Sequence, residues 1–243
     1  MPPMLPPLDP QAAQSFAALF LAHVLADFVF QTRWMVDRKR NLAVLLLHVG
    51  VVFVLSWGAL GGAWVVALMV ALAHFAIDAV KAWSPARWRD TLGAFLLDQG
   101  AHLLTLLAAA LWWPAAASQG LWAPWLPHLV APAIFLAGLI TTVLAGGYVV
   151  GMLTARFEVP LKGLPEAGRL IGQLERALIF LFVTIGEPTG IGFLIAAKSV
   201  LRFDTAKEDH RASEYVIIGT LASFAWALGA SYGTLVLMQI AQP

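Results

Sequence analysis

Long apolar stretches alternate with short polar ones along the whole chain. A helix rises about 1.5 Å per residue, so a bilayer crossing needs about 20 apolar residues. The stretches long enough for this cover residues 15–33, 41–57, 64–83, 91–113, 134–153, 170–201 and 215–238. The pattern therefore predicts an all-α fold, a polytopic bundle of transmembrane helices.

The stretch at 170–201 is longer than one crossing requires, and Gly186-Glu-Pro-Thr-Gly190 interrupts it. Read as one kinked helix, it gives seven membrane segments in total. Read as a helical hairpin broken at 186–190, it gives eight. We favour the hairpin, because it returns Arg202 and Lys207 to the side that carries the other basic residues.

Basic residues flank the segments on one side only. They follow the first and third segments, at Arg33, Arg38, Lys39, Arg40, Lys81, Arg87 and Arg89. Positive charge marks cytoplasmic loops, so the N-terminus is expected outside. The domain plan is then a tail at 1–14, a membrane half at 15–113, an external Trp- and Pro-rich linker at 114–132 and a second membrane half at 133–243.

Composition agrees with a membrane protein and narrows its chemistry. The 243 residues are 60% hydrophobic and 12% charged, and the mean hydropathy is +0.79. A net charge of +1 gives no reason to expect a nucleic-acid partner. The chain has no cysteine, which excludes thiolate metal ligands and thiol nucleophiles. Any metal ion would rely on His, Asp, Glu or Gln.

Histidines and aspartates recur four residues apart within the first four segments. Side chains at that spacing share one face of a helix. The chain has three such pairs and one further histidine: His23/Asp27, His74/Asp78, Asp98/His102 and His48. Counted from the cytoplasmic ends, all seven fall at a depth of roughly 8 to 16 Å. The sequence therefore predicts one interior cluster.

Ionisable groups inside a membrane are costly and usually pair or line a functional cavity. Imidazole and carboxylate groups are ligands of divalent Zn, Fe or Mn. The expected ligands are His23, His48, His74 and His102, and the expected catalytic residues, shared with ligation, are Asp27, Asp78 and Asp98. Candidate substrate contacts are Lys81, Gln31, Gln99, Glu175 and Arg176. The same pairs could instead serve as hydrogen-bonding contacts between helices.

Several motifs together resemble a known family. They are His23-x-x-x-Asp27-x-x-x-Gln31, His74-x-x-x-Asp78-x-x-Lys81 and Asp98-Gln99-x-x-His102, with Gly172-Gln-Leu-Glu175-Arg176, Ala197-Lys198-Ser-Val-Leu-Arg202-Phe203 and Glu214-Tyr-Val-Ile-Ile-Gly219-Thr further on. In these the chain resembles the uncharacterised bacterial membrane proteins of domain-of-unknown-function family 3307. The resemblance implies a multi-pass protein of the bacterial inner membrane and supplies no activity.

Three classes of function are compatible with the pattern. The leading hypothesis is a metal-dependent hydrolase that acts within the bilayer on a lipid or lipid-linked substrate. The first alternative is a transporter or channel for metal ions or protons, which would use the same residues as a transit site. The second alternative is a noncatalytic membrane scaffold or partner subunit, in which the His/Asp pairs serve packing alone.

Overall fold

The computed structural model describes residues 9–157, 166–201 and 210–241, and within them the only regular secondary structure is helical. The predicted all-α class is confirmed. The chain divides into two compact units. Unit 1 comprises Met1–Ala137 and Val236–Pro243, and unit 2 comprises Gly138–Leu235.

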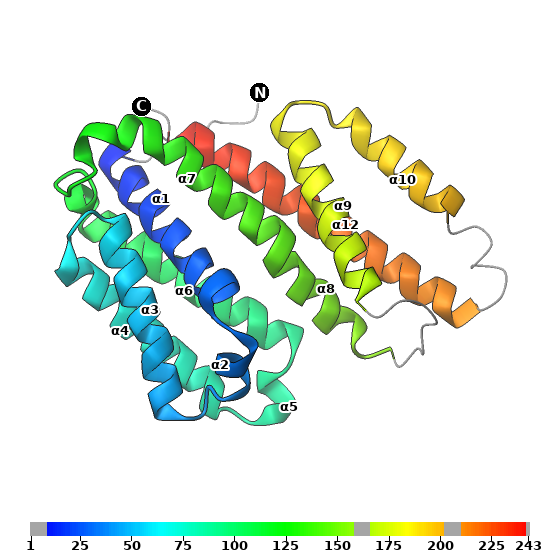
Figure 1. The fold of residues 1–243 in the computed structure, drawn as a ribbon, viewed down its shortest axis with the longest axis horizontal. Helices are drawn as coiled ribbons and strands as arrows, with labels where there is room; N and C mark the ends of the chain where they lie inside the picture. Colours follow the sequence, from blue (N-terminus) through cyan, green and yellow to red (C-terminus); the bar gives the residue numbers. More distant parts are fainter. Residues whose placement is uncertain (1–8, 158–165, 202–209, 242–243) are drawn as a thin grey trace. The chain divides into compact units, whose positions relative to one another are not determined.

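Four long helices form the body of unit 1. In chain order its elements are α1 (Pro10–Leu25), the π-helical turn η1 (Ala26–Phe30), α2 (Arg33–Asp37), α3 (Leu42–Ala59), α4 (Trp64–Trp83), α5 (Ala86–Arg89), α6 (Leu92–Trp112) and the 3-10 turns η2 (Pro114–Ala116) and η3 (Ala123–Trp125). Both α1 and α4 pack against α3 and α6, which closes a four-helix bundle (Figure 1).

Side-chain caps fix where these helices begin. Asp9, Asn41 and Thr91 each accept a hydrogen bond from a backbone N–H in the first turn of α1, α3 and α6. Before α4 the chain reverses at Gly61 and Gly62, whose φ angles of +67° and +113° suit glycine. Fixed helix ends set the level at which each buried polar side chain lies.

One end of unit 1 is closed by apolar packing. We call this group the apolar end cluster: Leu19, Leu60, Val66, Val70, Leu106, Ala109, Ala116, Ala117 and Leu126. The hydroxyl of Ser15 ties η2 to α1, because it donates to the carbonyl oxygen of Pro114 at 2.7 Å and accepts from the N–H of Ala117 at 3.1 Å. The apolar end cluster therefore fills the interior between the ends of α3 and α6 and the start of α4.

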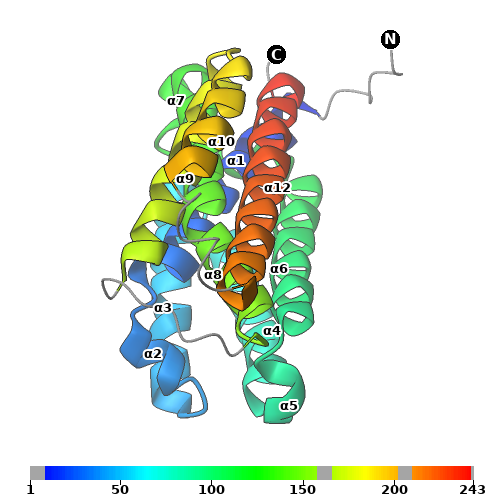
Figure 2. The same cartoon turned by 90° about the vertical axis from the view of Figure 1, so that its right-hand side faces the viewer.

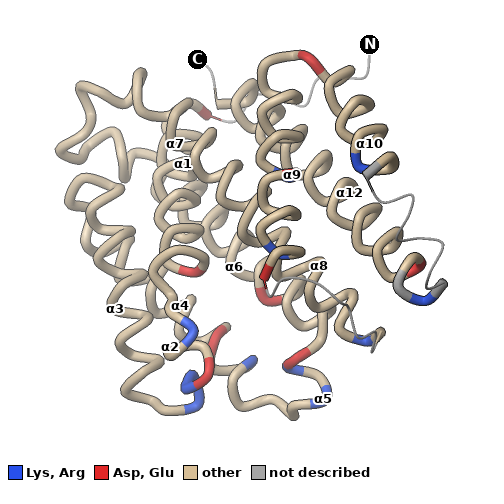
Figure 3. Tube along the Cα trace, turned by 45° about the vertical axis from the view of Figure 1, so that its right-hand side comes forward, with Lys and Arg blue, Asp and Glu red and all other residues tan. Residues whose placement is uncertain are grey.

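The other end of unit 1 is basic. Figure 2 shows α2 and α5 at the same end of the bundle, and Figure 3 shows Lys and Arg residues around them. We call this the basic end. The basic residues at this end are the ones from which the positive-inside rule assigns the cytoplasmic side.

Two helices cross from one unit to the other. They are α7 (Leu126–Ile140) and α12 (His210–Ile240). Within unit 1, Ile134 of α7 packs with Ala13 and Ala17 of α1 and with Ala241. The fifth segment starts at Leu126 rather than near residue 134, since Pro127 lies in the first turn, where its missing N–H is not needed.

Unit 2 contains a helical hairpin. Its elements are the π-helical turn η4 (Thr141–Ala145), α8 (Gly146–Thr154), α9 (Ala167–Thr184), α10 (Thr189–Leu201) and most of α12. The chain turns at Gly186, which has φ +79°, and α10 returns along α9 (Figure 1). An ion pair of 2.7 Å between Lys198 Nζ and Glu175 Oε2 joins the two arms.

Six helices of the described part of the chain are long and apolar enough to cross a bilayer, rather than the seven to eight segments expected. They are Pro10–Phe30, Leu42–Ala59, Trp64–Trp83, Leu92–Trp112, Ala123–Thr154 and Ser213–Ile240. The arms of the hairpin fall short for physical reasons. The 18-residue α9 carries three charged side chains, and α10 has only 13 residues, so neither matches the apolar thickness of a bilayer. The protein is a multi-pass membrane protein by helix length and composition.

Candidate metal centre

The bundle of unit 1 buries seven ionisable side chains between the apolar end cluster and the basic end. Each is at most 8% exposed: His23, Asp27, His48, His74, Asp78, Asp98 and His102. They come from α1, η1, α3, α4 and α6. The structure thus brings together the residues that the helical spacing placed at one level.

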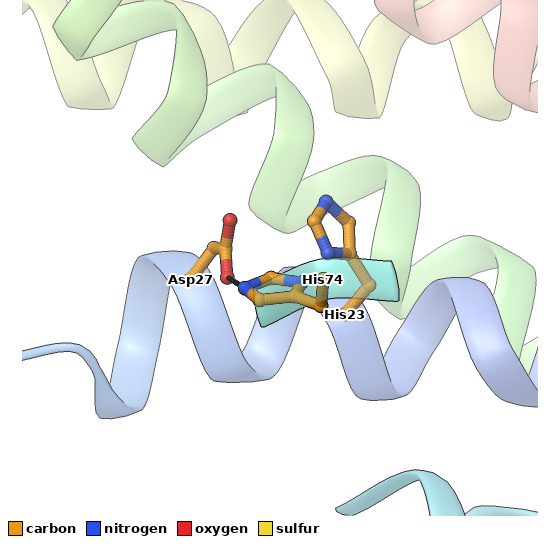
Figure 4. A group of neighbouring side chains, drawn as sticks. All are labelled: His23, Asp27 and His74. Carbon is orange, nitrogen blue, oxygen red and sulfur yellow. Dashed lines mark ion pairs between the residues drawn. The ribbon is translucent and has the colours of Figure 1, made fainter. Parts of the chain in front are cut away.

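A π-helical turn presents the first carboxylate. Helix α1 widens into η1 immediately after Leu25, and Asp27 lies in this turn. A π turn adds a residue to the helical circuit and so rotates the side chains that follow. Asp27 therefore does not share a simple α-helical face with His23, although the two are four residues apart. Figure 4 shows Asp27 directed at His74 of α4 with His23 beside them, and one ligand atom from each of the three residues lies within 4.8 Å of the others.

Two imidazole nitrogens lie close to each other and to one oxygen from each of two carboxylates. Nε2 of His48 lies 3.1 Å from Nε2 of His74. Asp27 Oδ1 lies 3.3 Å from the His48 nitrogen and 3.5 Å from the His74 nitrogen. Asp78 Oδ2 lies 3.6 Å and 3.4 Å from the same two atoms. We call His48, His74, Asp27 and Asp78 the tetrad.

The carboxylates of the tetrad each have one occupied and one free oxygen. Asp78 Oδ1 pairs with Lys39 Nζ at 2.8 Å, and Asp27 Oδ2 accepts a hydrogen bond from Gln99 Nε2 at 3.2 Å. The oxygens that face the imidazoles, Asp27 Oδ1 and Asp78 Oδ2, are buried and accept no hydrogen bond. Buried polar atoms are normally satisfied, so these two oxygens require a partner, which is either a protonated imidazole at 3.3 to 3.6 Å or a bound cation.

Gln99 is oriented by its neighbours. Its amide nitrogen lies 3.2 Å from Asp27 and 3.3 Å from Asp98, and only the NH₂ group of an amide can donate to carboxylates. The amide oxygen must then accept from His23, whose Nε2 lies 3.2 Å away. His23 is therefore a positioning residue for Gln99 in this structure, and its Nε2 carries the proton.

A second set of polar atoms lies on α6. Asp98 Oδ2 pairs with Lys81 Nζ at 2.9 Å, while Asp98 Oδ1 is buried without a partner. Both ring nitrogens of His102 are also buried without a hydrogen bond. The ring of His102 lies against that of His74, with centroids 4.1 Å apart.

Lys39 is the residue of this site that sequence reasoning missed. It stands in the basic cluster after α2, where the positive-inside rule accounts for it without any partner. Burial lowers the pKa of its ammonium group, but Asp78 and Asp27 together outweigh that effect and raise the pKa above its ordinary value. Lys39 therefore remains charged beside Asp78. The only sequence signal was the position of Lys39 in the short loop between α2 and α3, from which its side chain can reach back toward α4.

The remaining expected substrate contacts have other surroundings. Gln31 follows η1 and has a buried Nε2 without a hydrogen-bond partner. Glu175 and Arg176 lie in unit 2, where Glu175 pairs with Lys198. Arg176 donates from Nε and Nη2 to the carbonyl oxygen of Val143, at 3.1 and 2.9 Å, and from Nη1 to Ser223 Oγ at 3.2 Å.

Comparison with known proteins gives one match. No curated protein and no solved structure matches the chain. The matching family model, described as "Protein of unknown function (DUF3307)", covers residues 15–127. That range contains the whole tetrad, Lys39, Gln99 and the polar atoms of α6, and it ends before α9. Residues 15–127, a little under half of the chain, are therefore similar to this uncharacterised family.

Proposed function

We propose that the tetrad binds a divalent metal ion. In a tetrahedral site with bonds of about 2.0 to 2.1 Å, neighbouring ligand atoms lie about 3.3 to 3.4 Å apart. The five distances between imidazole nitrogens and carboxylate oxygens or between the nitrogens range from 3.1 to 3.6 Å. This spacing carries the proposal. Zn²⁺ suits a near-tetrahedral set of two nitrogens and two oxygens best, and Fe²⁺ or Mn²⁺ accept the same donors.

The surroundings of the tetrad support a metal ion over simple packing. Lys39 and Gln99 hold the outer oxygens of Asp78 and Asp27, as residues behind metal-ligating carboxylates commonly do. In a scaffold that used these groups for helix contacts alone, a protonated imidazole would have to pair with each buried carboxylate oxygen. A divalent cation would satisfy both oxygens while the imidazoles stay neutral.

The function we propose is hydrolysis of an anionic lipid or lipid-linked substrate in the bacterial inner membrane. A bound Zn²⁺ would polarise a carbonyl or phosphoryl oxygen and make a bound water acidic at neutral pH. Water would enter as a fifth ligand, as zinc sites allow. The side chains of Lys39 and Lys81 are 20% and 21% exposed. Their partial exposure supports entry of an anionic headgroup from the basic end.

The packing of unit 1 argues against transport through this bundle. A transit path needs polar groups or water on both sides of the ion site. The apolar end cluster occupies the bundle on the far side of the tetrad from the basic end. A site that opened only toward the basic end would suit an enzyme better than a channel.

Elemental analysis of the purified protein tests the metal site. We expect bound zinc in the wild-type protein and its loss from the tetrad in His48→Ala and His74→Ala. The control is His128→Ala, because His128 is exposed on α7 in the same unit. Wild-type protein that stays metal-free after incubation with Zn²⁺ would overturn the proposal.

Activity is tested in vesicles that contain phosphatidylglycerol, with mass spectrometry of the lipid products. Zinc-loaded wild-type protein is expected to hydrolyse the lipid, and His74→Ala to lose the activity. Ion flux measured in the same vesicles separates the alternatives. Zinc or proton flux without lipid hydrolysis would replace the hydrolase by a transporter.

A further inference from the structure

The polar atoms of α6 form a second group beside the tetrad. One ligand atom from each of Asp78, Asp98 and His102 lies within 4.8 Å of the others. We propose that this group binds a second divalent cation, so that the bundle holds a two-metal centre. The inference rests on the proposed function, because Asp78 belongs to the tetrad as well.

His102 carries the strongest evidence. It is 2% exposed, and neither of its ring nitrogens has a hydrogen-bond partner. A neutral imidazole has one N–H donor and one acceptor, and leaving both unsatisfied in the interior carries the full desolvation penalty of each group. A cation bound to one nitrogen removes half of this penalty. It also explains why a histidine occupies a fully enclosed position on α6.

Asp98 repeats the arrangement of the carboxylates in the tetrad. Its Oδ2 is held by Lys81 at 2.9 Å and by Gln99 at 3.3 Å, and its Oδ1 is buried and free. Three aspartates in this bundle thus each have one oxygen fixed by a donor and one oxygen free. This common pattern is what metal-ligating carboxylates with supporting donors show.

Asp78 connects the two groups. It contributes to the tetrad and to the group with Asp98 and His102, as a bridging carboxylate does in a two-metal site. The rings of His74 and His102, one from each group, lie 4.1 Å apart between centroids. Adjacent ligands of this kind suit two cations about 3.5 to 4 Å apart.

The second site has the chemical feature that the tetrad lacks. The tetrad already supplies four protein ligands, which is a complete tetrahedral set. The second group supplies three, and sites with three protein ligands keep a position for water or substrate. The second cation would therefore hold the nucleophilic water more readily than the first, which has room for it only as a fifth ligand. The first cation would bind the oxygen of the substrate that gains charge.

The net charge of the proposed two-metal centre indicates the class of substrate. With neutral imidazoles, the net charge of the site is −1, from the three carboxylates of Asp27, Asp78 and Asp98 and the two ammonium groups of Lys39 and Lys81. Two divalent cations raise the sum to +3, which is unfavourable in a membrane unless anions enter with them. A hydroxide and a phosphate ester together offset most of that excess. The centre thus selects a phosphate-bearing headgroup over a neutral ester.

Zinc stoichiometry tests the second site, with protein in nanodiscs that contain phosphatidylglycerol. We expect two equivalents in the wild type and in the His128→Ala control, and one equivalent in Asp98→Asn and His102→Ala. The ion that these variants retain shows that the tetrad has folded. One equivalent in the wild type, or two in Asp98→Asn, would overturn the second site and leave the proposed function standing. A wild type without zinc would overturn both.

Electron paramagnetic resonance of the Mn²⁺-loaded protein gives an independent readout. Two Mn²⁺ ions bridged by one carboxylate are expected to show an exchange-coupled spectrum in the wild type. Asp98→Asn is expected to show the spectrum of isolated ions. Isolated ions in the wild type at full loading would contradict a bridging role for Asp78.

Discussion

At the scale of single residues, the half-buried Lys39 supplies the countercharge for the buried carboxylate of Asp78. Asp78 is 1% exposed, and Lys39 reaches it at 2.8 Å from outside the transmembrane helices. Breaking a buried ion pair by removing one partner usually costs about 3 to 5 kcal/mol, because the other charge stays buried. The stability of the metal-free bundle should therefore depend on Lys39.

Lys39→Met tests this dependence by thermal unfolding in detergent. The variant is expected to unfold at a lower temperature than the wild type when metal-free, since Asp78 loses its countercharge. Added Zn²⁺ should recover most of the difference, because the cation neutralises the same carboxylate. Arg87→Met is the control, as Arg87 is exposed at the same basic end. An equal zinc response in Lys39→Met and the wild type would contradict the role of Asp78 as a ligand.

Spacing in the sequence predicted which residues share the interior but not which atoms meet. The pairs four residues apart and their common depth placed seven side chains at one level, and the structure buries all of them there. Asp27 also contacts His48 and His74 across the bundle, because the π turn η1 rotates its carboxylate toward them. A π turn has no clear sequence signature, so that rotation could not be predicted.

At the scale of elements, the turn between α3 and α4 sets the relative level of His48 and His74. Gly61 has φ +67°, and a Cβ added there would lie 2.6 Å from the backbone nitrogen of Leu121. The N–H of Leu121 donates to the carbonyl oxygen of Gly61 at 2.8 Å, which fastens the turn to the segment before α7. This contact leaves no room for a side chain.

Gly61→Ala is expected to lower the free energy of unfolding by about 1 to 3 kcal/mol through backbone strain. The close contact of the added Cβ with Leu121 adds to this loss. Gly50→Ala supplies the matched control. It lies inside α3 with nothing within 4 Å of an added Cβ, so it is expected to stabilise the helix slightly. Thermal unfolding of both variants in one detergent measures the difference. Similar unfolding temperatures would show that the turn can adjust.

The hairpin of unit 2 shows what the apolar stretches of a sequence can and cannot predict. Hydropathy predicted that residues 170–201 enter the membrane, and a break at Pro188 was visible in the sequence. The number of complete crossings could not be read in the same way, because α9 mixes apolar residues with an ion pair and a buried arginine. The pairing of Lys198 with Glu175 depends on the fold of the hairpin and has no counterpart in local sequence.

At the scale of the whole molecule, the orientation in the membrane decides which compartment reaches the proposed metal centre. The charge pattern predicts that the basic end of unit 1 faces the cytoplasm and that the apolar end cluster lies toward the outside. Substrate would then arrive from the cytoplasmic leaflet. The absence of native cysteine makes this orientation simple to measure.

Single cysteines report the orientation in intact cells treated with a membrane-impermeant maleimide. Gln119→Cys, beyond the apolar end cluster, is expected to react from outside. Ala86→Cys, at the basic end, is expected to react only after the membrane is permeabilised. Both positions are exposed. The reverse labelling pattern would place the metal centre's entrance on the outer side.

The amide of Gln99 links the two proposed metal positions. One nitrogen contacts Asp27 at 3.2 Å and Asp98 at 3.3 Å, so a single side chain serves a ligand of each group. An ion that fixes Asp27 also fixes Gln99, and thereby lowers the entropy that Asp98 must lose when it binds the other ion. The affinity of each position then depends on the occupancy of the other by the same factor. Where anions offset the added charge, the centre would fill cooperatively, and the protein would respond to metal supply as a switch rather than in proportion.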